Sequence, residues 1–141
     1  MPQKHFLPTS VKIETIIKLF LGKKQAHALI SHDFIVPFLT KTSQQLSAGQ
    51  RRIIEILLII HSKSEFILLD EPFNGLSPIL KEYIVACILE AKKAKGIIIT
   101  DHDYENVLNL ADKVVFLKDG FLREIKNRGQ LLEFGYFVRI N

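Results

Sequence analysis

Two kinds of hydrophobic pattern follow each other along the chain. Up to residue 46, apolar residues recur at helical spacing, first in VKIETIIKLFL, which Gly22 ends, and then in HALISHDFIVPFL, which Pro37 interrupts. From residue 47 onward, helical patterns alternate with unbroken apolar runs of strand length. The patterns therefore predict an interrupted helical segment up to about residue 43, a polar loop, and then an α/β segment.

Three apolar runs in the second segment are predicted to form strands. They are EFILLD, GIIIT and KVVFLKDG, at residues 65–70, 96–100 and 113–120. Because polar residues do not alternate within them, we expect strands that are covered on both faces, as in a parallel sheet. Between the first two runs, Ser77 can cap a helix and Pro78 suits its first turn. This strand–helix–strand unit predicts a ligand site beyond the carboxyl ends of the strands.

The stretch LSAGQRR has two compatible interpretations. Ser47 and Gln50, just ahead of a long apolar run, have the spacing of a capping box that starts a helix from Ala48 to about Ser62. A loop of small residues at a helix N-terminus is also a common phosphate site. Local spacing does not decide between the two roles.

Composition narrows the class of protein. The net charge of +4 is spread along 141 residues without a basic block, so no nucleic-acid partner is expected. The single cysteine, Cys87, indicates a reducing compartment. The longest apolar stretch, residues 53–60, contains Glu55, and the N-terminus has no apolar signal-peptide core. We therefore expect a cytoplasmic chain.

Candidate chemistry lies where two predicted strands end. Asp70 and Glu71 follow the first strand, so one carboxylate could hold a hydrated Mg²⁺ while the other orients and deprotonates a water. His102, after Asp101 at the end of the next strand, could donate a hydrogen bond to a phosphate. The alternatives are two solvated charges at a strand end and an exposed histidine in a turn.

Taken in order, LSAGQ, FILLDEP, NGLSP and IITDH resemble the motifs of ATP-binding cassette (ABC) ATPases. LSAGQ is similar to the signature loop, with Ala48 in place of the more usual glycine. FILLDE matches the Walker B strand and catalytic glutamate, NGLS the D-loop, and His102 the switch histidine. Gln3 is similar to the Q-loop glutamine. The usual D-loop aspartate is Ser77 here, which puts communication across a dimer in doubt.

The resemblance implies a fold and a set of roles. The fold would be a P-loop NTPase-like α/β core with a mostly parallel sheet over residues 47–141, preceded by a Q-loop and α-helical subdomain over residues 1–46. Asp70 and Gln3 would hold Mg²⁺ through water, and Glu71 would act as the general base.

The remaining roles concern nucleotide and partners. His102 would contact the γ-phosphate of ATP. Ser47, Gly49 and Gln50 would face an ATP held by a second ABC ATPase domain in a head-to-tail dimer. The chain would be the ATP-binding subunit of an ABC transporter, coupling ATP hydrolysis to transport with a transmembrane permease at the inner face of the cell membrane.

One motif that ATP binding needs is missing. The 141 residues contain no P-loop of the form GxxxxGK[ST], because LGKKQ at residues 21–25 lacks both the upstream glycine and the hydroxyl. The chain begins almost at the Q-loop, so we expect the N-terminal part of the fold to be missing and the chain to be inactive alone. Two alternatives stay open: a non-transport ABC protein, and a non-catalytic module that lends its signature loop to a partner with its own P-loop.

Overall fold

The computed structural model describes residues 5–126 and 129–130. The chain divides into two compact units, residues 1–103 and residues 104–141. Each unit is described by itself below.

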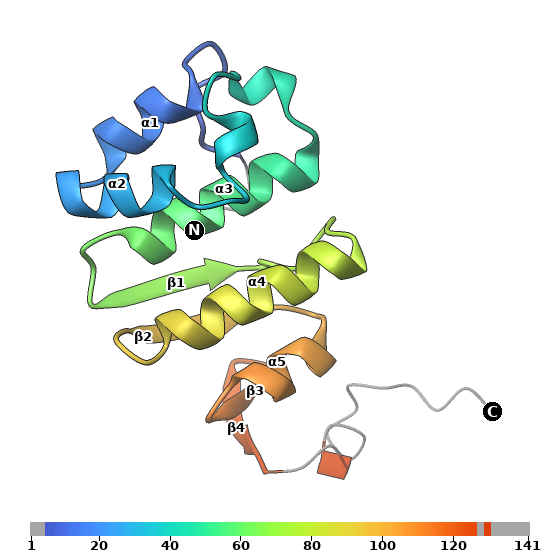
Figure 1. The fold of residues 1–141 in the computed structure, drawn as a ribbon. Helices are drawn as coiled ribbons and strands as arrows, with labels where there is room; N and C mark the ends of the chain where they lie inside the picture. The colour runs from blue at the N-terminus through green and yellow to red at the C-terminus, as the bar shows by residue number, and fades with distance from the viewer. Residues whose placement is uncertain (1–4, 127–128, 131–141) are drawn as a thin grey trace. The chain divides into compact units, whose positions relative to one another are not determined.

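The first unit begins with short helices (Figure 1). They are α1 (Ile13–Phe20), α2 (Lys23–Ile30) and two 3-10 turns, η1 (Val36–Phe38) and η2 (Ser43–Gln45). Gly22 separates α1 from α2, as predicted. The predicted interruption at Pro37 is wrong, because α2 already ends at Ile30 and Pro37 lies within η1. α1 buries Ile13, Ile16 and Ile17 on one face, as its helical spacing requires.

The predicted strand–helix–strand unit is confirmed. β1 (Phe66–Asp70) pairs in parallel with β2 (Gly96–Thr100), with Asp70 opposite Thr100, and α4 (Pro78–Ala91) connects the two strands. Ser77 occupies the N-cap position of α4 as predicted, but its side chain makes no capping hydrogen bond. α3 (Ala48–His61), the helix predicted from Ala48 to about Ser62, precedes β1 and is buried over most of its length.

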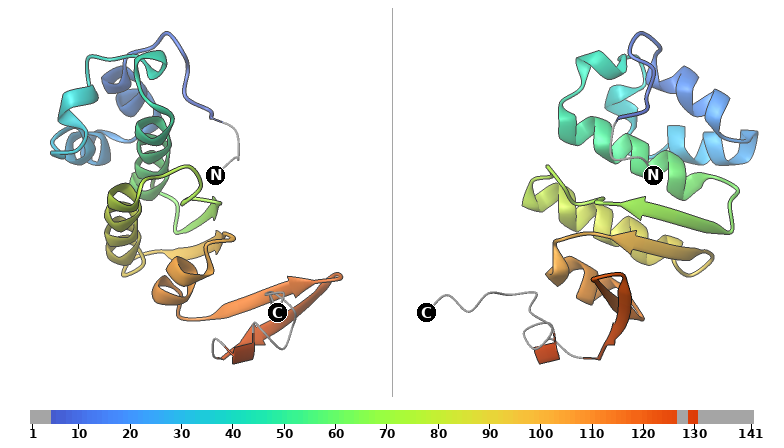
Figure 2. Two further views of the ribbon diagram at one scale, coloured as in Figure 1. Left: turned by 90° about the vertical axis from the view of Figure 1, so that its right-hand side faces the viewer. Right: turned by 180° about the vertical axis from the view of Figure 1, so that it is seen from behind.

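The expectation that both faces of these strands are covered is wrong for the described part of the first unit. Ile67 and Leu69 are buried, whereas Phe66, Leu68 and Ile98 are 77%, 53% and 62% exposed. α3 and α4 lie on the same side of the sheet (Figure 2). Side chains alternate between the faces of a strand, so every second apolar residue stays on the open face.

The second unit contains α5 (Tyr104–Leu110) and the antiparallel pair β3 (Val114–Lys118) and β4 (Phe121–Ile125). The third predicted strand therefore exists, but within the described residues it pairs in a hairpin and not in a parallel sheet. The connecting residues Asp119 and Gly120 both have positive φ, 51° and 80°. Positive φ at both central residues is typical of the tight hairpin turn that Asp-Gly favours.

No helix within the described ranges is both long enough and apolar enough to cross a bilayer.

Candidate functional site

The N-terminus of α3 is closed by the predicted capping box. Ser47 Oγ accepts a hydrogen bond from the backbone N–H of Gln50 at 3.2 Å, and the Gln50 side chain accepts one from the backbone N–H of Ser47 at 3.0 Å. The N–H groups at the next two positions, Ala48 and Gly49, point out of the helix end without an acceptor from the helix itself. The helix end therefore keeps two backbone donors for a ligand beside the exposed Ser47.

Gly49 brings this helix end against the loop that follows β1. A Cβ atom at position 49 would lie 3.3 Å from Leu80 Cδ1, 3.7 Å from Leu76 Cδ2 and 3.9 Å from the carbonyl oxygen of Gly75. The signature-like stretch and the stretch NGLSP, which are far apart in the sequence, are thus neighbours in the structure.

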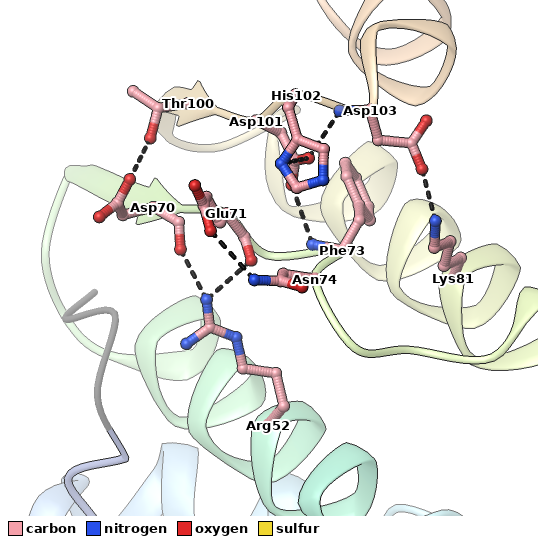
Figure 3. Close-up of polar contacts among 10 residues, drawn as sticks. All are labelled: Arg52, Asp70, Glu71, Phe73, Asn74, Lys81, Thr100, Asp101, His102 and Asp103. Carbon is pink, nitrogen blue, oxygen red and sulfur yellow. Dashed lines mark hydrogen bonds and ion pairs between the residues drawn. The ribbon is translucent and has the colours of Figure 1, made fainter.

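The two carboxylates at the end of β1 lie in different environments (Figure 3). Asp70 Oδ1 accepts a hydrogen bond from Thr100 Oγ1 at 2.5 Å, across the strand pair. Glu71 leaves the strand with φ of +47°. Its backbone N–H donates to the Thr100 carbonyl oxygen at 2.7 Å, and its side chain accepts a bond from Asn74 Nδ2 at 3.1 Å. Left-handed φ is unfavourable for a residue with a Cβ, so these contacts hold Glu71 in a costly conformation.

Arg52 is the buried cation of the site. One guanidinium nitrogen, Nη2, donates to the carbonyl oxygens of Asp70 and Glu71, at 2.6 and 2.8 Å. Burial lowers the pKa of Arg52, while the nearby negative charge of Glu55, and then those of Asp70 and Glu71, raises it. Because an arginine stays charged even when its pKa falls somewhat, Arg52 brings a fixed positive charge to the end of β1.

The residues after β2 divide into a buried acid and an exposed histidine. The Asp101 side chain is fully buried and accepts hydrogen bonds from the backbone N–H groups of Phe73 and Asp103, at 3.0 and 2.8 Å. The His102 side chain is 68% exposed, and its Nδ1 lies 3.8 Å from Asp101 Oδ1. Asp103 forms an ion pair of 2.5 Å with Lys81 of α4. His102 is thus held at the same sheet edge as Asp70, with its ring accessible to solvent.

A hollow of about 370 Å³ connects these elements. Its walls come from the N-terminal segment, the start of α3 and the loop after β1: His5, Ala48, Arg52, Glu71, Asn74 and Gly75. Among the described residues, Glu71 is the one predicted site residue in its wall, whereas Ser47, Asp70 and His102 lie outside it. Gln3 lies outside the described residues.

The oxygen donors fit Mg²⁺ in one particular manner. The described residues contain no cluster of three or more His, Cys, Asp or Glu side chains that could enclose a metal ion. Mg²⁺ usually keeps several waters and is held through one or two carboxylates together with substrate phosphates. A single strand-end carboxylate such as Asp70, beside the hydroxyl of Thr100, is compatible with that mode of binding.

Three residues that shape the site were not identified as site residues from the sequence. Arg52, Glu55 and Asp101 are all buried and connect elements distant in the chain. A signal existed for two of them, since Glu55 is a charged residue within the apolar run of residues 53–60 and Arg52 directly precedes that run. Charged side chains are rarely buried unless they are paired.

Comparisons with known proteins agree on one family. The profile of the ABC transporter family matches residues 2–74. The carnitine transport ATP-binding protein OpuCA of Listeria monocytogenes is 31% identical over 137 residues, which are 94% of this chain and 34% of OpuCA. The energy-coupling factor transporter ATP-binding protein EcfA2 of Mycoplasmoides gallisepticum is 43% identical over 77 residues, which are 54% of this chain and 24% of that protein.

A solved structure has the same fold. An ATP-binding subunit of an ABC transporter superimposes with a TM-score of 0.79 at 19% identity, over 95% of this chain and 60% of that one. The P-loop NTPase-like α/β fold that the sequence resemblance implied is therefore confirmed. The chain spans about a third of the length of OpuCA and a quarter of that of EcfA2.

Proposed function

This chain belongs to the ABC transporter family, and on that premise we propose that it forms the part of an ATP-binding subunit that carries the signature loop, the Walker B carboxylates and the switch histidine. In this role it contributes to MgATP hydrolysis that is coupled to transport. The helical subdomain over residues 1–46 and the α/β part over residues 47–141 are the division we propose for it.

One observation carries this proposal: the start of α3 and the ends of β1 and β2 lie together. Gly49 packs beside Gly75, and Asp70 is hydrogen-bonded to Thr100, two residues before His102. In an open α/β sheet, ligands bind beyond the carboxyl ends of the strands. The sequence motifs that resemble the family thus coincide with the edge at which such folds act.

The roles of the individual groups follow from their chemistry. When bound, Mg²⁺ would neutralise charge on the phosphates of ATP. We assign Asp70 to hold that ion through water, together with Gln3, and Glu71 to orient the attacking water and accept its proton. His102, whose ring is accessible, donates to the γ-phosphate. The backbone of Glu71 leaves the strand with positive φ, and the hydrogen bond from Arg52 to the Glu71 carbonyl oxygen stabilises this turn.

The signature loop is expected to contact a nucleotide other than the one near Asp70 and Glu71. We propose that Ser47, Gly49 and Gln50 face an ATP held by a second ABC ATPase domain in a head-to-tail dimer. The exposed helix end, with the N–H groups of Ala48 and Gly49 directed outward, supports phosphate binding there. A transmembrane permease is the proposed transport partner, which places the subunit at the inner face of the cell membrane. No nucleic-acid partner is proposed.

The 141 residues contain no P-loop, so we expect this chain by itself not to hydrolyse ATP. The test is a chimera in which this chain replaces the 137 matched residues of OpuCA. We expect MgATP hydrolysis by the chimera, its loss in Glu71→Gln, and its retention in Glu82→Gln, an exposed glutamate of α4. A chimera that folds and binds ATP but hydrolyses it equally well with Glu71→Gln contradicts the assignment.

A non-catalytic role is the second candidate, because Ser47 is exposed and does not line the pocket that contains Glu71. In that role the chain lends its signature loop to a complete ABC ATPase domain. Hydrolysis by a mixture of the two proteins would then be lost with Ser47→Arg in this chain but not with Glu71→Gln.

A further inference from the structure

α3 carries two buried charged residues that connect opposite ends of the candidate site. Glu55 has no exposed surface, and its two oxygens contact the N-terminal segment. Oε1 accepts a hydrogen bond from the backbone N–H of Phe6 at 2.8 Å, and Oε2 lies 3.0 Å from His5 Nδ1. Arg52 lies three residues earlier on the same helix and binds the end of β1.

The two side chains depend on each other electrostatically. Residues three apart on a helix are neighbours on its surface, and the negative charge of Glu55 is the largest influence that favours the charged form of Arg52. A buried charge without an opposite partner is strongly unfavourable. Loss of the Glu55 charge would therefore weaken the hold of Arg52 at its buried position.

Arg52 in turn fixes an unusual backbone geometry. Carbonyl groups of consecutive strand residues point toward opposite sides, yet those of Asp70 and Glu71 both reach one nitrogen of Arg52. They converge because Glu71 has left the strand with positive φ. The carbonyl oxygen of Glu71 also accepts the backbone N–H of Asn74 at 3.2 Å. Arg52 thus stabilises the turn from which the Glu71 carboxylate projects (Figure 3).

We propose that Arg52 and Glu55 are positioning residues that couple residues 5–6 to the backbone conformation of Glu71. The catalytic meaning of this coupling rests on the proposed function, in which Glu71 is the base. A displacement of residues 5–6 changes the contacts of Glu55, which changes the hold of Arg52 on the carbonyl of Glu71.

Amide hydrogen exchange in the chain itself tests the coupling without any nucleotide. Three backbone N–H groups report on successive steps: Phe6, which binds Glu55; Asn74, which binds the Glu71 carbonyl; and Glu71, which binds Thr100. Glu55→Gln keeps an acceptor for Phe6 but removes the charge that supports Arg52. We expect roughly tenfold faster exchange at Asn74, as for loss of one hydrogen bond to a charged group, with Phe6 little changed.

Further variants separate positioning from general stability. Arg52→Met should accelerate exchange at Asn74 and Glu71, and Arg52→Lys, which keeps a cationic donor, should restore part of the protection. Glu82→Gln, on the exposed face of α4, is the control and should change none of the three amides.

A double-mutant cycle between partly exposed His5 and Arg52 tests the coupling with milder substitutions, which are less disruptive to folding. If the coupling exists, His5→Ala and Arg52→Lys together change exchange at Asn74 by an amount that differs from the sum of the single effects. Additive effects would overturn the proposal. The proposal would also be overturned if the variants accelerated hydrogen exchange equally at every amide, in proportion to their loss of global stability. A chimera without ATPase activity contradicts the proposed function alone, because the exchange experiment involves no nucleotide.

Discussion

The buried carboxylate of Asp101 accepts the backbone N–H of Phe73 at 3.0 Å, which fastens the loop after β1 to the end of β2. Its other oxygen accepts the N–H of Asp103 at 2.8 Å. One acid thereby orders the loops that carry two candidate catalytic residues, Glu71 and His102. Carboxylates that accept backbone N–H groups form charge-assisted hydrogen bonds, which are stronger than neutral ones.

Asp101→Asn should lower the free energy of unfolding by about 1–3 kcal/mol, because the amide NH₂ would face a backbone N–H and leave a buried donor unsatisfied. Urea unfolding followed by circular dichroism measures the change. Asp103→Asn is the matched control: its side chain forms a partly exposed ion pair with Lys81, so a loss of at most about 1 kcal/mol is expected. Equal losses in the two variants would contradict the role given to Asp101.

Glu71 should show that a glycine fits its backbone better than an alanine. Both substitutions remove the carboxylate, but only glycine adopts φ of +47° without cost. We expect Glu71→Gly to be more stable than Glu71→Ala by about 1 kcal/mol in urea unfolding. At Glu82, in the middle of α4, the same pair should have the opposite order, because glycine costs about 1 kcal/mol relative to alanine in a helix.

Local signals in the sequence predicted much of the first unit. The capping box of Ser47 and Gln50 and the β1–α4–β2 unit depend on residues close together in the chain, and both are present. The β3–β4 hairpin was not predicted, although Asp-Gly at residues 119–120 is itself a local signal for a tight hairpin turn.

Long-range contacts explain what the sequence could not predict. Arg52 binds carbonyl groups of residues 18 and 19 positions further along, and Glu55 binds a backbone N–H 49 positions earlier. Periodicity places these side chains on a helix but does not say what they meet. The left-handed turn at Glu71 likewise depends on Arg52 and Thr100, which lie on other elements. The geometry around the candidate base is therefore a property of the fold.

The N-cap serine of α3 should contribute more to the free energy of unfolding than the N-cap serine of α4. Ser47 accepts the backbone N–H of Gln50, so Ser47→Ala should cost about 1 kcal/mol of unfolding free energy, and Ser47→Gly only a few tenths. Ser77 occupies the corresponding position of α4 without a side-chain capping bond. Ser77→Ala should accordingly leave the urea midpoint nearly unchanged. An equal loss at the two positions would argue against the capping role of Ser47.

His61 should make the stability of the chain depend on pH. It lies at the end of α3, where burial lowers the pKa of its ring below the ordinary value of 6.5. The hydrogen bond between Nδ1 and the Leu57 carbonyl oxygen, 2.9 Å long, opposes this shift, and the positive charges of His32 and Lys95 add to it.

The sign follows from proton binding. Because the pKa is lower in the folded state, the unfolded chain binds more protons once the pH falls below about 6.5. The contribution of neutral His61 is therefore complete above that pH and is lost as the pH falls toward the folded pKa. We expect His61→Gln, which does not titrate, to lose less stability than the parent chain between pH 7 and pH 5. Parallel curves of unfolding free energy against pH for the two proteins would show that burial does not lower the pKa of His61.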